Sequence, residues 1–454
     1  MAKTSLRGLI VEILQEVIYK NRFLKESLHE KDYSAFENPE KALGFAETVT
    51  RGVIERLPFL SYVLSEVSTV PEKKMRPKIR LILLSGAYQI LFMQTEDYAA
   101  VNESVKLASA MGFSSLKGFV NGVLRHISRE KESFFKTAGD KEKSGLPGEL
   151  YDLYVSWFGK ENTDKICEAD LSAGTKEFYV RKMSGFSAAE FEAALEKEGI
   201  SFKRDPFYEN LYSLRSFGSI ERSSVFQAGM FYVQSPGSFM ATEIGKDLFS
   251  FGNDGFSVLD ACASPGGKTV GARDKMAGRG HILSCDVSLE KLSDISENLK
   301  RYSFDNVSLL VRDAAVYEPE FREKFDVVIA DLPCSGLGTV SHKPEIRLHV
   351  QEASLKELSA LQKKILDNLS LYVRPGGTLL FSTCTLCPWE NEDNFRYFLE
   401  KHPAFSGDDI SAFLPENLRF DSAKAGFLQI LPGISGNEGF FISRLTKKNS
   451  SSVY

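Results

Sequence analysis

The chain has 454 residues, of which 43% are hydrophobic and 26% charged, and its formal net charge is −5. This composition is typical of a globular protein of two or three domains, and an acidic chain does not predict nucleic-acid binding unless basic residues gather locally. Six cysteines are too few for a disulfide scaffold, and no run approaches the ~20 apolar residues of a membrane helix. We therefore expect a cytoplasmic protein without a membrane segment.

Residues 1 to about 143 carry apolar residues at helical spacing. The first 22 residues are amphipathic, because Glu12 and Glu16 interrupt their apolar positions, and this distinguishes them from a signal peptide. The pattern predicts a helical bundle that packs its own core. Five positive charges then fall within eight residues, which indicates either a solvated helix start or a phosphate-binding patch. They are Lys73, Lys74, Arg76, Lys78 and Arg80.

Three segments of this helical region, residues 84–91, 101–105 and 118–125, resemble the N-terminal domain of RsmB-type ribosomal RNA methyltransferases. That domain is similar to the antitermination factor NusB, a helical RNA-binding protein. The resemblance implies a NusB-like RNA-binding domain over residues 1–143.

The middle of the chain mixes helical and extended patterns. Residues 130–147 are rich in Lys, Glu, Ser and Gly and are typical of a linker. Strands are expected at 178–181 and 231–234, and a helix at 187–197 with Ser187 as its N-cap. We expect a small α+β module over residues 148–240 that contacts RNA, as RsmB-like proteins have there, and a methyltransferase domain over 241–447.

From residue 256 onward, short apolar runs alternate with helical stretches. Strands are expected at 257–260, 282–285, 307–311, 327–330 and 378–381. This alternation predicts a doubly wound, Rossmann-like α/β sheet. A hairpin at 429–433 and 438–442 closes the sheet, and a polar tail follows Arg444.

Acids follow the first three of these strands. A glycine pair lies at the first strand-to-helix turn, while the glycine spacings of NAD-binding and P-loop proteins are absent. Several acids without a phosphate cradle suit a cofactor such as S-adenosylmethionine. The alternative for Asp260, Asp286 and Asp313 is N-capping of helices.

Residues 260–269 resemble the first cofactor motif of the RNA cytosine-C5 methyltransferases, the RsmB, RsmF and NSUN family. The resemblance implies that Asp286 binds the ribose, that Asp313 lies at the adenine, and that Asp331 faces both cofactor and target base. It also implies that one backbone segment holds the methionine end of the cofactor. The residues of that segment are Cys262, Ala263, Ser264, Pro265, Gly266, Gly267 and Lys268.

Two cysteines follow buried strands. Cys334 comes three residues after Asp331, and Cys384 follows the next comparable strand. From sheet geometry alone Cys334 would be chosen as a nucleophile. Methylation of cytosine C5 requires a thiolate added at C6 and an unstacked base. Residues 331–336 and 382–385 resemble the two cysteine motifs of this family, which implies that Cys384 attacks C6.

The same resemblance assigns the remaining roles. It implies that Cys334 assists product release, that Asp331 engages the base and that Lys268 reaches the target. Residues 342–347 resemble the family's loop after the Cys334 motif, which suggests a contact with RNA. Glu390, Asn391 and Glu392 complete the second motif.

Other cysteines have simpler interpretations. Cys167 and Cys285 are expected to be small buried hydrophobes. Cys384 and Cys387 form a C-x-x-C pair, which leaves open a redox pair or half of a zinc site. Because no second pair completes a zinc site, no metal is expected.

The sequence therefore predicts S-adenosylmethionine-dependent methylation of cytosine C5 in 16S rRNA through a covalent cysteine–C6 adduct. We expect a monomer that acts on unassembled or partly assembled rRNA. Three alternatives remain open: the same chemistry on another rRNA or tRNA site, a non-catalytic RNA-binding ribosome-assembly factor, and a small-molecule methyltransferase.

Overall fold

A computed structural model describes residues 5–172, 177–215, 220–250, 253, 255–436 and 438–449. The chain divides into two compact units. The first comprises Met1–Ser172 with Val340–Gln351, and the second Ala173–Thr339 with Glu352–Tyr454. A short stretch from the second half of the chain thus belongs to the first unit. No helix in the described ranges is long and apolar enough to cross a membrane.

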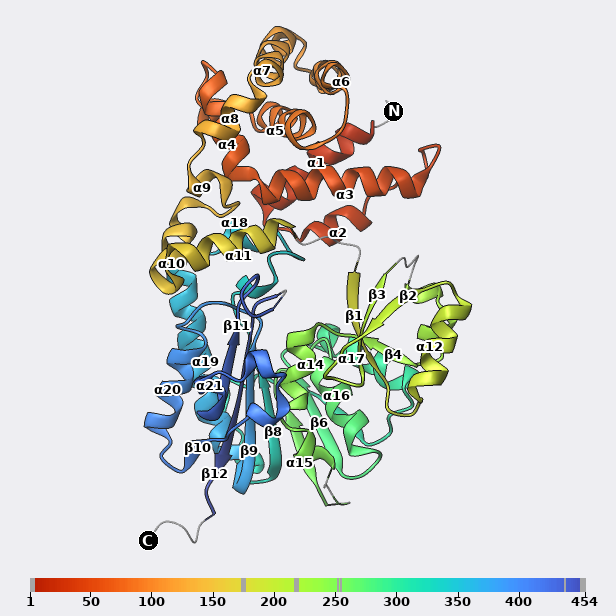
Figure 1. The fold of residues 1–454 in the computed structure, drawn as a ribbon, viewed down its shortest axis with the longest axis vertical. Helices are drawn as coiled ribbons and strands as arrows, with labels where there is room; N and C mark the ends of the chain where they lie inside the picture. The colour runs from red at the N-terminus through yellow and green to blue at the C-terminus, as the bar shows by residue number, and fades with distance from the viewer. Residues whose placement is uncertain are drawn as a thin grey trace. The chain divides into compact units, whose positions relative to one another are not determined.

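The described part of the first unit is helical (Figure 1). Its core is one cluster of buried aliphatic and aromatic side chains drawn from its first eight helices. The α-helices are α1 (Leu6–Lys20), α2 (Leu24–His29), α3 (Pro39–Glu55), α4 (Leu57–Val67), α5 (Pro77–Phe92), α6 (Asp97–Ala110), α7 (Lys117–Arg129), α8 (Lys131–Thr137), α9 (Asp140–Lys143), α10 (Gly148–Phe158), α11 (Lys160–Ser172) and α18 (Ile346–His349). Two 3₁₀ turns, η1 (Glu72–Lys74) and η2 (Ser114–Leu116), lie between them.

The expected linker at 130–147 is wrong, because this stretch forms α8 and α9. Three of its apolar side chains are buried, since Phe134, Ala138 and Leu146 are each at most 5% exposed, whereas Phe135 is 38% exposed. The polar composition of this stretch gives no indication that these three side chains are buried. The first unit therefore continues past residue 143 through α10 and α11.

The second unit contains a small antiparallel sheet of four strands in the order β2-β3-β1-β4. The strands are β1 (Glu177–Lys182), β2 (Ser201–Arg204), β3 (Leu211–Arg215) and β4 (Phe231–Val233), accompanied by α12 (Ala188–Lys197) and α13 (Ser224–Gln227). Ser187 caps α12 in a reciprocal capping box with Glu190. The expected strands and the capped helix of the α+β module are present, but its expected start at residue 148 is wrong, because residues 148–172 form α10 and α11 of the first unit.

The large sheet has eight strands, and the predicted Rossmann-like architecture is confirmed. Its order is β10-β12-β9-β8-β5-β6-β7, with β11 paired to β12. The strands are β5 (Ser257–Asp260), β6 (His281–Asp286), β7 (Val307–Val311), β8 (Phe325–Asp331), β9 (Val373–Thr383), β10 (Phe405–Gly407), β11 (Phe427–Ile430) and β12 (Phe440–Lys447). Strands β5 to β9 run parallel, and β10 to β12 are antiparallel to their neighbours.

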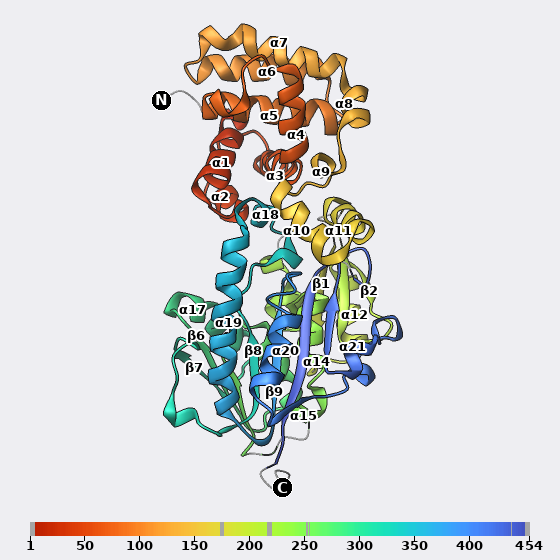
Figure 2. The same cartoon turned by 90° about the vertical axis from the view of Figure 1, so that its left-hand side faces the viewer.

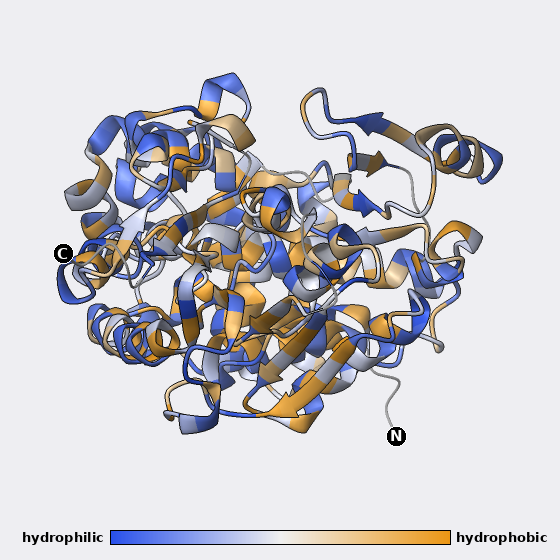
Figure 3. Cartoon of the chain, turned by 90° about the horizontal axis from the view of Figure 1, so that it is seen from below, coloured by the Kyte–Doolittle hydropathy of each residue, from blue (hydrophilic) through white to orange (hydrophobic). Residues whose placement is uncertain are grey.

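Helices cover both faces of this sheet (Figures 1 and 2). They are α14 (Pro236–Glu243), α15 (Lys246–Ser250), α16 (Gly267–Met276), α17 (Leu289–Arg301), α19 (Glu352–Tyr372), α20 (Glu392–Lys401) and α21 (Asp421–Lys424). Along β8, Val327 and Ile329 pack with α14 to α16, whereas Val328 and Ala330 pack with α19 and α20. Both faces of β8 are therefore buried, and several strand segments appear in the hydrophobic colour in Figure 3.

The expected polar tail after Arg444 is wrong in its first three residues. Strand β12 continues to Lys447, since Leu445 and Thr446 pair with β9 and Lys447 with β10.

The order of the parallel strands reverses between β5 and β8. In open α/β sheets, ligands bind beyond the carboxyl ends of the strands at such a reversal. Asp260 ends β5 and Asp331 ends β8, so both carboxylates lie at this position.

Candidate active site

The two cysteines expected at the site lie together. Strands β8 and β9 are parallel neighbours in which Asp331 pairs with Ser382, so the loops that follow them leave the sheet side by side. The Sγ atoms of Cys334 and Cys384 are 3.5 Å apart, and both residues are half-buried. Two thiols at this distance share a proton easily, because either can donate to the other.

An ion pair lies beside the thiols. The Lys268 ammonium, at the start of α16, donates to Oδ2 of Asp331, and Oδ1 of Asp331 accepts a 2.7 Å hydrogen bond from the Ser382 hydroxyl. The ammonium also lies 5.3 Å from the centre of the Phe440 ring. Both oxygens of Asp331 thus have partners, which fixes the orientation of this carboxylate.

The charges around the site shift the pKa values of Lys268 and Cys334. Burial alone would lower the pKa of the Lys268 ammonium, but the Asp331 carboxylate outweighs it, with a further attraction from Cys384, and the pKa is raised. The hydrogen bond with Cys384 and burial raise the pKa of the Cys334 thiol well above its usual range, and the charges of Cys384, Glu390 and Asp331 act in the same direction. Lys268 is therefore a cation, and Cys334 holds its proton.

The loop after β5 turns into α16 at Gly266, whose φ of +104° lies in the region that favours glycine. The three acids at the strand ends do not cap helices, which decides against the capping alternative. Asp260 accepts from the Thr269 hydroxyl, and Asp286 from the backbone N–H groups of Ser264 and Val287.

Asp313, the third of these acids, accepts from the N–H of Ala315 in a turn after β7. Large apolar side chains are exposed beside these acids: Val287 is 56%, Leu289 75% and Val316 57% exposed. Acids next to exposed apolar groups at the end of a parallel sheet form a surface suited to a nucleoside, with hydroxyls for the acids and a flat ring for the apolar side chains.

Comparison with known proteins gives this arrangement a family. A family model described as 16S rRNA methyltransferase RsmB/F matches residues 251–446, and one described as the NusB family matches residues 4–129. The probable ribosomal RNA small subunit methyltransferase B of Bacillus subtilis (strain 168) is 30% identical over 99% of this chain and 100% of its own length. The chain belongs to the ribosomal RNA small subunit methyltransferase B family.

Further relatives agree. The ribosomal RNA small subunit methyltransferase B of Cronobacter sakazakii is 26% identical over 98% of this chain and 99% of its own length. Among solved structures, PH0851 matches with a TM-score of 0.75 at 22% identity, covering 98% of this chain and 99% of that one. NSun6 of Pyrococcus horikoshii, solved with the S-adenosylmethionine analogue SFG, matches with a TM-score of 0.57 at 20% identity over 66% of this chain and 98% of its own. The last two show the fold.

S-adenosylmethionine is the cofactor of this family, and the residues of the site fit it. Asp260 is fully buried, and its Oδ1 has no hydrogen-bond partner in the described part of the chain. Burial raises the pKa of this carboxyl to about 7. An unpaired buried carboxyl oxygen suits an added donor such as an amino group. The acids and exposed apolar side chains after β6 and β7 suit the adenosine.

One expectation for the methyltransferase is wrong in part. The loop at 342–347 was expected to contact RNA, but Arg347 and Glu345 are buried inside the first unit. The Arg347 guanidinium donates to the carbonyls of Gly145 and Val340, and Glu345 accepts from the N–H of Leu24. These side chains support α18 instead of facing RNA.

The sequence missed Gln362 of α19, which has polar contacts behind the Cys334 loop, because its position in an ordinary helix gives no signal. Ser382 of β9 lies in the second cysteine motif, but its hydrogen bond to Asp331 could not be deduced from that. Glu390 belongs to a recognised motif, but its role could not be deduced from that.

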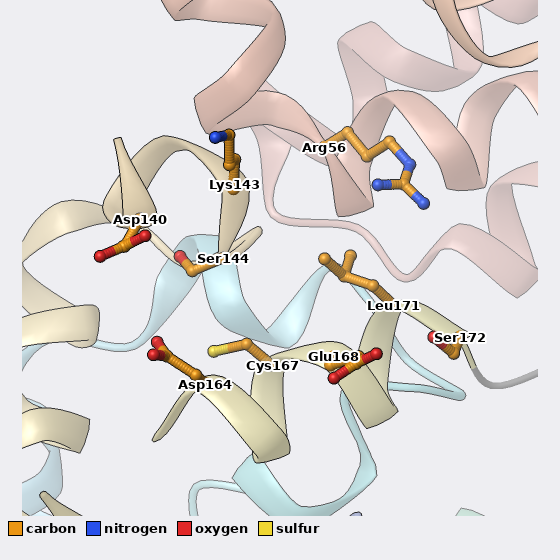
Figure 4. A pocket seen from close by; sticks show the side chains of 9 residues that line it. All are labelled: Arg56, Asp140, Lys143, Ser144, Asp164, Cys167, Glu168, Leu171 and Ser172. Carbon is orange, nitrogen blue, oxygen red and sulfur yellow. The ribbon is translucent and has the colours of Figure 1, made fainter. Parts of the chain in front are cut away.

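A hollow in the first unit holds a third cysteine, Cys167 (Figure 4). Burial raises the pKa of this thiol to about 12, so it is not a nucleophile at neutral pH. Cys167 and Cys285 are buried, as expected for small hydrophobes. Cys387 is also buried, and the sulfur that faces Cys384 belongs to Cys334. In the ranges described, no group of three His, Cys, Asp or Glu side chains could hold a metal ion.

Proposed function

We propose that this methyltransferase transfers a methyl group from S-adenosylmethionine to carbon 5 of a cytosine in 16S rRNA, through a covalent bond between Cys384 and carbon 6. The observation that carries the proposal is the pair of sulfurs 3.5 Å apart beside the Lys268–Asp331 ion pair. Two thiols at the ends of neighbouring strands match a reaction that forms and later breaks a carbon–sulfur bond.

The reaction begins at an unstacked cytosine. The Cys384 thiolate adds to C6, and the electron pair of the C5–C6 double bond moves toward C5. The Lys268 ammonium favours the anionic sulfur, since the two attract each other. Bound S-adenosylmethionine supplies the methyl group as a sulfonium electrophile. Asp331, held by Lys268 and Ser382, is positioned to hydrogen-bond the base.

Release needs a base for the C5 proton, and Cys334 supplies it at the right moment. The largest cause of its raised pKa is the hydrogen bond with Cys384. Once Cys384 is bonded to carbon, that contribution and the anionic charge are gone, so the Cys334 thiol becomes more acidic. It then gives its proton to solvent, and the resulting thiolate takes the proton from C5. The C5–H electron pair restores the C5–C6 double bond as the Sγ–C6 bond breaks and its electron pair leaves on the Cys384 sulfur.

We further propose that the helical unit holds the rRNA, before or during assembly, through the basic residues of η1 and α5. Lys73, Lys74, Arg76 and Lys78 are exposed, whereas Arg80 forms an ion pair with Glu72. Four exposed cations within six residues form a patch suited to phosphates on an otherwise acidic chain. We call these four residues the basic patch.

Bisulfite sequencing of 16S rRNA from cells with and without the gene tests the substrate and the product. We expect one cytosine to lose its methyl group in the deletion strain, and unchanged cytosine methylation would contradict the proposal. Re-expression of Cys384→Ala should not restore the methyl group, because no adduct forms, while Cys167→Ala serves as the control that restores it.

The division of labour between the thiols has its own test. Purified Cys334→Ala should accumulate a covalent protein–RNA adduct on denaturing gels, because C6 is attacked but the product is not released. Cys384→Ala should form none. If instead Cys334→Ala prevented the adduct and Cys384→Ala formed it, the two roles would be reversed.

A further inference from the structure

A buried carboxylate, Glu390, lies behind the two cysteine loops. It follows β9 and precedes α20, and its side chain is 0% exposed. A buried acid is costly unless charge-assisted hydrogen bonds offset its desolvation, so its contacts indicate what it does.

Its hydrogen-bond donors include Ser335 of the Cys334 loop and Gln362 of the helix behind it, with the Cys387 thiol as a further partner. Oε2 accepts from the backbone N–H of Ser335 at 2.9 Å and from Nε2 of Gln362 at 2.9 Å. Oε1 accepts from the Ser335 hydroxyl at 2.5 Å. A carboxylate matches this set because it offers acceptors only, and its charge strengthens each bond.

The contacts continue to both sides of Cys334. Nε2 of Gln362 also donates to the carbonyl of Pro333 at 2.8 Å, and its Oε1 accepts from Asn394 at 2.7 Å. The chain is thus held one residue before and one residue after Cys334. The Ser335 hydroxyl lies 2.6 Å from that of Thr385, the residue after Cys384, which ties the two loops together.

We propose that Glu390 is a positioning residue that sets the distance between the Cys334 and Cys384 sulfurs by holding the Cys334 loop through Ser335 and Gln362. This deepens the proposed function and rests on it for the meaning of that distance. Glu390 acts through other residues and contacts no reacting atom.

The charge of Glu390 has a second effect. Burial raises the pKa of its carboxyl, with the bonds from Ser335 and Gln362 opposing. The groups that act on Cys334 are Cys384, Glu390 and Asp331, and the Glu390 carboxylate disfavours an anion at Cys334. Lys268, by contrast, attracts an anion at Cys384. The two thiols therefore differ in how readily each becomes an anion.

A thiol cross-linking assay tests positioning without any methylation. Diamide oxidises two neighbouring thiols to a disulfide and is itself reduced to the hydrazine, and mass spectrometry of peptides measures the rate for the Cys334–Cys384 pair. We expect Glu390→Ala to slow this rate about tenfold or more, and to lower kcat by about 10²-fold with an unchanged KM for RNA, because misplacement of about 1 Å has such effects.

The isosteric Glu390→Gln should restore the cross-linking rate to within about threefold of wild type. Its amide oxygen accepts from the Ser335 N–H and from Gln362, and its NH₂ donates to the Ser335 hydroxyl. With the charge gone, alkylation of Cys334 should begin at a lower pH than in wild type. The matched control is Glu400→Gln, which changes an exposed glutamate of the same helix α20 and should change neither readout.

Wild-type cross-linking rates in Glu390→Ala, or a failure of Glu390→Gln to restore them, would overturn the proposal. If Glu390→Ala does not fold, Ser335→Ala removes the hydroxyl contacts alone, and a rate equal to wild type there would also overturn it. The cross-linking assay does not depend on methylation, so it tests the positioning role alone. The proposed function would fail on a different result, namely that wild-type rRNA contains no methylated cytosine.

Discussion

At the residue scale, the two thiols are distinguished by charges that come from distant parts of the chain. Lys268 precedes Cys384 by more than a hundred residues, and the carboxylate of Glu390 reaches the Cys334 loop from beyond β9. Both cysteines follow buried strands at the same edge of the sheet, and sheet geometry alone would select Cys334. The family motif supplied the assignment to Cys384, and the charges provide a physical reason for it.

Replacement of Lys268 tests that reason. In Lys268→Met the cation is lost and the Asp331 carboxylate is left without its partner, so an anion at Cys384 is disfavoured twice. We expect the pH at which Cys384 is half alkylated by iodoacetamide to rise by about 1–2 units, because unit charges a few ångströms apart at a partly buried site interact by a few kcal/mol. Peptide mass spectrometry after timed alkylation measures it.

The control is Lys300→Met, which removes an exposed lysine from α17. It should leave the alkylation profile of Cys384 unchanged. An equal profile for Lys268→Met and wild type would contradict the role given to the ammonium.

At the element scale, the parallel strands of the large sheet could be predicted closely because each contains a short apolar run. The run expected at 257–260 is β5, and that expected at 307–311 is β7. Elements that depend on partners far away in the sequence could not be predicted in this way. Strand β12 reaches Lys447 because β9 and β10 pair with it, and α8 and α9 form because a few apolar residues find a core.

The start of α5 is an element whose charges lend themselves to a test. Replacing Lys73, Lys74 and Lys78 by Gln should weaken 16S rRNA binding about tenfold and reduce the slope of log K against log salt by up to ~2, since each phosphate contact contributes ~0.7 for single strands. Filter binding at several salt concentrations measures both quantities. S-adenosylmethionine affinity should not change.

A control variant with the same change in net charge separates the effect of the lysines' position from the effect of total charge. Lys25, Lys41 and Lys143 are exposed elsewhere in the helical unit, and their replacement by Gln should leave the salt slope as in wild type. Equal slopes for the two triple variants would assign the binding to overall charge and contradict the basic patch.

At the scale of the whole molecule, the division into units does not follow the order of the chain. Val340–Gln351 follows the Cys334 loop in sequence but belongs to the helical unit. Arg347 is fully buried there, and its charge opposes the rise in pKa that burial causes at two acids, Glu55 and Asp170. A motif-based interpretation placed this segment at the RNA because nothing in its local composition reveals that its arginine lies inside a helical core.

A fragment of residues 1–172 therefore lacks a buried cation that the unit contains. Burial raises the pKa of Asp170 to about 7, with Arg347 opposing the rise. Between the unfolded value of 3.8 and the folded value, only the folded state holds the proton, so the free energy of unfolding falls as pH increases. Without Arg347 the folded pKa moves higher and the fall extends further, on top of the ~3–5 kcal/mol typical of a broken buried pair.

Thermal unfolding of this fragment at pH 6 and pH 8 tests the argument. We expect a lower Tm at pH 8 than at pH 6, and a much smaller difference in the fragment with Asp170→Asn, because that substitution removes the charge that has to be buried. Asp152→Asn, at an exposed ion pair with Lys141, should retain the full difference. A fragment whose Tm does not depend on pH, or depends on it equally with and without Asp170, would contradict the cost of burying this carboxylate in the fragment.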